Sequence, residues 1–124
     1  MIFVDTCIII DYINGKIEIS SHEKATLYMN SIVENEVIIG VKNKRDLATT
    51  NKKISNFPIL DIDQDIMDLS TKLLNQYVLS HSMTIYDAII ASTCMIYDLP
   101  LWTYNKKDFR FLDIDLVDIG NYEK

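Results

Sequence analysis

Apolar positions along the chain occur in two kinds of segment, short runs rich in β-favouring residues and longer stretches with a helical period. Residues 2–4 form a short apolar run that predicts a buried strand. Residues 63–79 carry apolar side chains at positions 66, 69, 73 and 77, which is the spacing of a helix face. The same criteria predict strands at 25–30, 58–61, 101–103 and 116–119. They predict helices at 7–13, from about Ser20 or Ser21, at 32–40, at 45–55 and from Thr84 to Tyr97.

Helix boundaries are indicated by capping residues. Ser31 followed by Glu34 has the spacing of a capping box, in which each side chain satisfies a free backbone N–H of the first turn. Thr84 and Asp87 have a similar relation, and Asn14-Gly15 is a plausible helix stop. The helix after Thr84 is apolar on almost every side, which predicts a central position in the fold.

Strands that alternate with helices predict βαβ units and a mostly parallel sheet. We therefore expect an α/β protein, a three-layer α/β/α sandwich with a short sheet of four or five strands. At 124 residues the chain has the length of a single domain, 1–124.

Composition excludes several classes of protein. Apolar residues make up 48% of the chain and charged residues 24%, which rules out a disordered or low-complexity chain. The longest uncharged apolar run, 88–97, is shorter than the roughly 20 residues of a membrane span. Two cysteines are too few for a disulfide scaffold. We therefore expect no membrane partner, reduced thiols and a cytoplasmic location.

The net charge of −6 argues against binding of nucleic acid by bulk electrostatics. However, five bases fall within twelve residues: Lys42, Lys44, Arg45, Lys52 and Lys53. This cluster has two interpretations, a solvated helix face or a local patch that contacts phosphates.

Candidate chemistry is found by asking which polar residues follow the predicted strands, because sites in open parallel sheets form beyond the carboxyl ends of the strands. Asp5, Glu36, Asn105 and Asp108 follow strands, and Asp87 opens the apolar helix. All five are oxygen donors, which suits Mg²⁺ or Mn²⁺ better than Zn²⁺. The alternative is structural: each residue also fits a helix cap, a turn or an exposed helix face.

A divalent ion would relieve the repulsion among converging carboxylates, polarise a phosphate oxygen and lower the pKa of a bound water. The chain contains no phosphate-binding glycine loop, no His-Glu zinc motif and no nucleophile elbow. Spacing alone therefore leaves both the metal site and the structural reading open.

Four stretches resemble the motifs of the PIN-domain family, above all the VapC-type toxins of toxin–antitoxin modules. The resemblance extends over nearly the whole chain, in order and with similar spacing. The stretches are 4–11 (VDTCIIID), 31–40 (SIVENEVIIG), 86–91 (YDAIIA) and 99–109 (LPLWTYNKKDF).

The resemblance implies a PIN fold and a Mg²⁺- or Mn²⁺-dependent endoribonuclease that cleaves RNA with a metal-activated water. In this reading Asp5, Glu36 and Asp87 hold the metal, and Asn105 and Asp108 complete the acidic pocket. Thr6 and Thr103 help to position these ligands. The resemblance also implies a homodimer and a cognate VapB-like antitoxin.

Two positions depart from the family pattern. Many members carry Asp where this chain has Asn105, which brings an oxygen but no charge. Many carry Asn where this chain has Cys7, and Cys7 is expected to pack as a small apolar residue.

Two alternative functions remain open. A catalytically silent PIN-fold module would bind RNA or protein without cleavage, with Asn105 as a sign of lost activity. A phosphoacceptor receiver domain has similar length and an acidic Mg²⁺ pocket, but Asp61 and Lys106 are its only candidates for the acceptor and the lysine.

Overall fold

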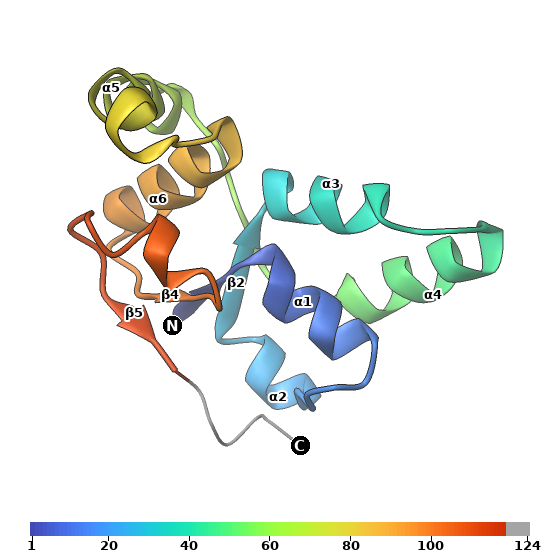
Figure 1. Ribbon diagram of the computed structural model, residues 1–124. Helices are drawn as coiled ribbons and strands as arrows, with labels where there is room; N and C mark the ends of the chain where they lie inside the picture. Colours follow the sequence, from blue (N-terminus) through green and yellow to red (C-terminus); the bar gives the residue numbers. More distant parts are fainter. Residues whose placement is uncertain (119–124) are drawn as a thin grey trace.

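Five short parallel strands form the centre of the fold in the computed structural model, which describes residues 1–118 (Figure 1). Every neighbouring pair is parallel, and the order is β3-β2-β1-β4-β5. This confirms the predicted parallel sheet of four or five strands. The strands are β1 (Ile2–Val4), β2 (Leu27–Asn30), β3 (Ile59–Leu60), β4 (Leu101–Trp102) and β5 (Leu116–Val117).

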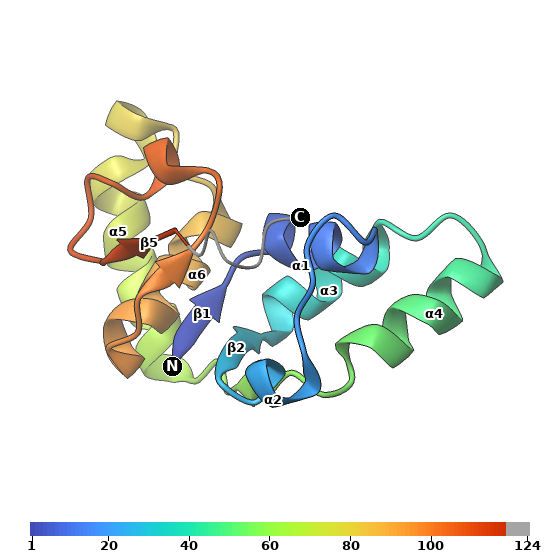
Figure 2. The same ribbon diagram turned by 90° about the horizontal axis from the view of Figure 1, so that it is seen from below.

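Helices flank the sheet, so the predicted α/β sandwich is confirmed. Helices α5 and α6 lie together on one side of the molecule, and α1, α3 and α4 lie on the other (Figures 1 and 2). The helices are α1 (Thr6–Ile13), α2 (Ser21–Lys24), α3 (Ser31–Ile39), α4 (Lys44–Ile54), α5 (Gln64–His81) and α6 (Ile85–Tyr97), with a 3₁₀ turn, η1 (Lys106–Asp108).

The register of the central strands determines which residues meet at the edge of the sheet. Val4 on β1 pairs with Trp102 on β4, and both side chains are buried. Asp5 follows Val4 and Thr103 follows Trp102, so these two residues lie side by side at the carboxyl end of the sheet. Two residues that are 98 positions apart in the chain become neighbours through strand pairing.

Helix α3 begins differently from the prediction. The cap is Asn30, whose Oδ1 accepts a hydrogen bond from Val33 N at 3.1 Å, and Ser31 is already the first helical residue. The predicted Ser31–Glu34 capping box is therefore wrong. Asn30 is fully buried and its Nδ2 donates to Thr93 Oγ1 at 3.0 Å, so this side chain satisfies polar groups on two helices at once.

Helix α6 is central, as predicted. Its residues 88–94 are all buried, and Thr84 Oγ1 accepts from Asp87 N at 3.2 Å, which confirms the predicted helix start. The backbone geometry therefore places Asp87 in the first turn, at the third helical position.

Helix ends follow simple turn chemistry. Helix α1 ends at Asn14 and Gly15, and Gly15 adopts a φ of 75°, where L side chains are disfavoured. Helices α5 and α6 end in the left-handed region at Ser82 (φ 52°) and Asp98 (φ 54°). Helix α5 continues two residues beyond its predicted end at 79 and turns the predicted apolar stripe at 66, 69, 73 and 77 toward the core.

Three further observations bear on the expectations from sequence. Cys7 and Cys94 are both free thiols. Of the predicted strand 116–119, only Leu116–Val117 is a strand, and Ile119 lies outside the described residues. Within residues 1–118, no helix is both long enough and apolar enough to cross a membrane.

Candidate metal centre

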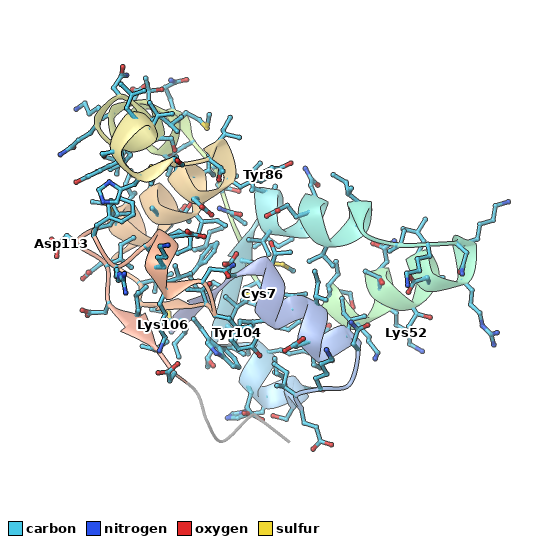
Figure 3. The ribbon with its side chains drawn as sticks, viewed as in Figure 1. Cys7, Lys52, Tyr86, Tyr104, Lys106 and Asp113 are labelled. Atoms are coloured by element: carbon cyan, nitrogen blue, oxygen red, sulfur yellow. The ribbon has the colours of Figure 1, made fainter. Side chains whose placement is uncertain are left out.

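Four carboxylates gather at the carboxyl end of the sheet, each on a different element. Asp5 follows β1 and caps α1, and Glu36 lies two turns into α3. Asp87 lies in the first turn of α6, and Asp108 ends η1. Cys7 and Tyr104, close in sequence to Asp5 and Asn105, lie near the middle of the molecule between the two groups of helices (Figure 3).

Asp5 is held rigidly by its neighbours. Its Oδ1 accepts from Thr6 N at 2.7 Å, and its Oδ2 accepts from Thr103 Oγ1 at 2.7 Å. The side chain is only 6% exposed, and burial raises the pKa of this carboxyl although both hydrogen bonds oppose the rise. Asp5 is thus a helix cap as well as a member of the acidic group.

Glu36 is linked to the same loop through Thr6. Thr6 Oγ1 donates to Glu36 Oε1 at 2.9 Å, while the Thr6 backbone donates to Asp5. Desolvation raises the pKa of Glu36, and the negative charge of Asp5 adds to the rise. One threonine therefore holds two carboxylates that repel each other.

Asp87 receives the combined field of the other three carboxylates. Its pKa is raised to about 6, first by partial burial and then by Asp108, Asp5 and Glu36. Asp108 also contributes to the raised pKa of Asp5. The structure therefore brings Asp5, Glu36, Asp87 and Asp108 into one electrostatically coupled group.

Asn105 joins this group through its backbone rather than its side chain. Its amide N–H donates to Thr103 Oγ1 at 3.0 Å, so the hydroxyl that holds Asp5 is itself oriented by Asn105. The Asn105 side chain is exposed and does not cap η1. The carboxamide of Asn105 takes no part in the hydrogen bonds around Asp5.

Cys7 contacts polar atoms of the site. Its Sγ lies 3.9 Å from Asp5 Oδ2 and 3.8 Å from Thr103 Oγ1, at the edge of the range for a weak sulfur hydrogen bond. Burial raises the pKa of this thiol, so it stays protonated beside the carboxylate. Cys7 packs against the hydrophobic core, as expected, and its contacts with Asp5 and Thr103 add to that packing.

Carboxylate oxygens are suitable ligands for a hard divalent cation, although these side chains do not converge on a single point. Within residues 1–118, no three His, Cys, Asp or Glu side chains are already positioned to hold one ion. Oxygens of Asp5 and Glu36 are engaged by Thr6 and Thr103. Burial is the first cause of the raised pKa values of Asp5, Glu36 and Asp87, and repulsion among the carboxylates adds to it. An oxygen-preferring cation would offset both effects.

Two residues that position the site were not found from the sequence. Asn30 and Thr93 connect the start of α3 to the middle of α6, the helices that carry Glu36 and Asp87. Asn is a favoured cap residue, so Asn30 was detectable as an alternative to Ser31. The contact with Thr93 spans 63 positions and has no local signal.

Comparisons with known proteins agree with this geometry. The PIN domain family model matches residues 2–115. Ribonuclease VapC from Rickettsia bellii is 32% identical over 88% of each chain, and ribonuclease VapC1 from Methanocaldococcus jannaschii is 33% identical over 90% of this chain and 80% of that protein. A chain of a toxin–antitoxin complex from Klebsiella pneumoniae superposes with a TM-score of 0.74 at 26% identity, over 94% of this chain and 97% of that one. The chain belongs to the PIN domain family.

Proposed function

We propose that this chain is the ribonuclease toxin of a VapBC-type toxin–antitoxin pair. The observation that carries the proposal is the group of four coupled carboxylates at the carboxyl end of the sheet, with the pKa of Asp87 raised to about 6. Such a group is costly unless a cation neutralises it, and costly groups of titratable residues mark functional sites. Relatives named ribonuclease VapC at 32% and 33% identity give the reaction class.

PIN-domain ribonucleases of the VapC type generally depend on a divalent metal ion. We assign Mg²⁺ or Mn²⁺ to this chain, because the donors are carboxylate oxygens with no histidine among them. When bound, the ion supplies Lewis-acid polarisation of a phosphate oxygen and a water of lowered pKa. Asp5, Glu36 and Asp87 are the proposed ligands, and Asp108 and Asn105 complete the pocket.

The residues of the chain have distinct tasks in this proposal. Thr103 and the Thr6 backbone fix both oxygens of Asp5, so Asp5 is the rigid reference point of the site. Asp87 and Asp108 are more exposed than Asp5 and keep the freedom to turn toward a cation. Together these carboxylates would hold the ion, which when bound would supply a water of lowered pKa for attack on the phosphodiester.

A cleavage assay on total cellular RNA tests the proposal. The purified chain is incubated in Mg²⁺, in Mn²⁺ and in EDTA, beside the variants Asp5→Asn and Asp113→Asn. Asp113 is an exposed aspartate at the outer edge of the molecule and serves as the matched control (Figure 3). We expect discrete fragments that need both the metal and Asp5 and that persist in Asp113→Asn.

The competing function is a silent module that binds RNA or protein without cleavage. The exposed Asn105 side chain is the observation that favours it, since the carboxylate of many relatives is missing here. RNA retention without cleavage in either metal, followed by cleavage in Asn105→Asp, would establish this alternative.

The proposed pair also requires a protein partner. A structural neighbour at 26% identity is a toxin–antitoxin complex, so we propose that a VapB-like antitoxin binds this chain in the cytoplasm. We further propose a homodimer, because apolar side chains are exposed where α5 ends and α6 begins: Val78, Leu79 and Ile85. Light scattering of wild type and Leu79→Lys tests it, with loss of the dimer expected in the variant.

A further inference from the structure

Helix α4 concentrates positive charge on an acidic protein. Residues 41–55 contain five bases and one acid, a net charge of +4 in a chain whose total is −6, so the remaining residues carry ten net negative charges. Within residues 1–118 none of these five bases forms an ion pair. We define the basic stripe as the four exposed members: Lys42, Lys44, Arg45 and Lys52.

Three of the four stripe residues lie along one face of the helix, and Lys42 precedes its N-cap. With about 3.6 residues per turn, Lys44, Arg45 and Lys52 project to the same side of α4, opposite the buried Thr50 and Ile54. Eight residues at about 1.5 Å each span about 12 Å. Phosphates follow one another about every 3.4 Å along one strand of a nucleic acid duplex. The stripe is therefore long enough to contact about three of them.

The helix dipole favours Lys52 and Lys53, which lie in the last turn of α4, but it does not account for the two bases at the start of the helix. Lys44 and Arg45 occupy the first turn of α4, where the positive end of the helix dipole repels cations. The fifth base, Lys53, has a structural task, because its Nζ donates to Ile13 O at 2.8 Å and ties α4 to α1. Lys24 Nζ also donates to Lys53 O at 3.1 Å, so two hydrogen bonds anchor the end of α4 to the rest of the fold.

A pocket lies between the start of the stripe and the two helices, α1 and α3, that carry Thr6 and Glu36. Thr6 and Glu36 are hydrogen-bonded at the centre, and the residues one turn further on, Ile10 and Gly40, line a pocket of about 530 Å³. Lys42 and Arg45 line the far side of that pocket. Cys7, beside Asp5, lies in the first turn of α1, and Lys52, on α4, lies near the other end of α1 (Figure 3).

From this position beside the helices that carry Thr6 and Glu36, we propose that the basic stripe binds the RNA backbone and holds it near the acidic centre. The inference rests on the proposed function, because it takes RNA as the substrate. The acidic centre repels phosphates when no cation is bound, so a chain that acts on RNA needs a separate anchor of opposite charge. Charge complementarity therefore favours a polyanion over an apolar ligand at this surface.

The test compares the triple variant Lys44→Gln/Arg45→Gln/Lys52→Gln with Lys72→Gln, an exposed lysine on α5 at the opposite side of the molecule. Both are made in the Asp5→Asn background, and binding of a labelled single-stranded RNA is followed by fluorescence anisotropy at several salt concentrations. Each lost phosphate contact lowers the slope of log affinity against log salt by about 0.7. We expect the slope to fall by about 2 in the triple variant and to stay unchanged in Lys72→Gln.

Kinetics in the otherwise wild-type chain provide a second readout. We expect the triple variant to raise KM about tenfold or more at 100 mM salt and to leave kcat unchanged, because the stripe acts on binding and not on the reacting atoms. Thermal unfolding of the variant checks that α4 remains folded.

The outcomes separate this inference from the proposed function. Equal slopes and equal KM in the triple variant and in Lys72→Gln would overturn the inference even if RNA is cleaved. Stripe-dependent binding without cleavage would support the inference and count against the nuclease. Unchanged RNA binding with loss of poly-L-glutamate binding would assign the stripe to an acidic protein and overturn the proposal.

Discussion

At the scale of single residues, Asp87 is the clearest example of a carboxyl group whose surroundings disfavour its charged form. Partial burial and three neighbouring carboxylates raise its pKa to about 6. The unfolded chain has no such environment, so Asp87 ionises there near its ordinary value of 3.8. The folded state therefore binds a proton more tightly at this position than the unfolded state does.

This difference predicts the effect of Asp87→Asn on stability. A raised pKa of an acid favours folding below pH 3.8, and the advantage is lost as the pH rises through about 6. Removing the charge should therefore stabilise the metal-free chain at pH 8 by about 1 kcal/mol, a figure that allows for solvent screening of this half-buried group. Chemical denaturation at pH 8 and pH 4 measures it, and the gain should vanish at pH 4.

The same carboxylate predicts a pH dependence of metal binding. Protons and cations compete for Asp87, so the affinity for Mn²⁺ measured by calorimetry should fall as the pH drops below about 6. The control Asp113→Asn should show the same profile as wild type. A flat affinity between pH 5 and pH 8 would remove Asp87 from the set of ligands.

At the scale of elements, a buried hydrogen bond between Asn30 and Thr93 links α3 and α6, the helices that carry Glu36 and Asp87. Asn30 caps α3 and donates to Thr93 on α6, and Thr93 Oγ1 in turn donates to Ile89 O at 2.7 Å. Both side chains are inaccessible to solvent. The distance between Glu36 and Asp87 thus depends on two polar groups that touch neither.

We predict that Thr93→Val destabilises the protein by about 1–3 kcal/mol, because it leaves the Asn30 amide buried without its acceptor. Thr71→Val on the exposed face of α5 is the matched control and should change stability by less than about 0.5 kcal/mol. Urea denaturation provides both values. Equal effects of the two substitutions would mean that the buried link contributes nothing.

How much of this arrangement the sequence predicts depends on the range of the interactions involved. The order of elements, the parallel sheet and the caps at Thr84 and Asn14 follow from local patterns, and the structure confirms them. The start of α3 was predicted wrongly because Asn30 and Ser31 are both good caps, and burial against Thr93 decides between them. The contacts of Thr103 with Asp5, and the outward turn of Asn105, depend on strand pairing and have no local signature.

At the scale of the whole molecule, the proposed metal centre would couple cation binding to folding. A ligand that binds only the folded state stabilises it, by about 1.4 kcal/mol at ten times its Kd. The four carboxylates come from elements spread between residues 5 and 108, so the unfolded chain has no equivalent site.

Addition of Mn²⁺ should therefore raise the melting temperature by several degrees, and EDTA should reverse the effect. In Asp5→Asn the shift should be small, and in Asp113→Asn it should equal that of wild type. We propose that the chain is a single domain, which predicts one unfolding transition with and without the ion. Calorimetry gives both quantities, and two separate transitions would contradict the single domain.

The position of β1 in the middle of the sheet has a consequence during synthesis. The first strand pairs with β2 early, but its other neighbour, β4, begins only at Leu101. Asp5 cannot contact Thr103 and Asp108 until these residues have been synthesised, which takes about 5–20 seconds at usual elongation rates. The proposed acidic centre is therefore incomplete until residue 108 has been added, and a shorter nascent chain is expected not to cleave the RNA around it.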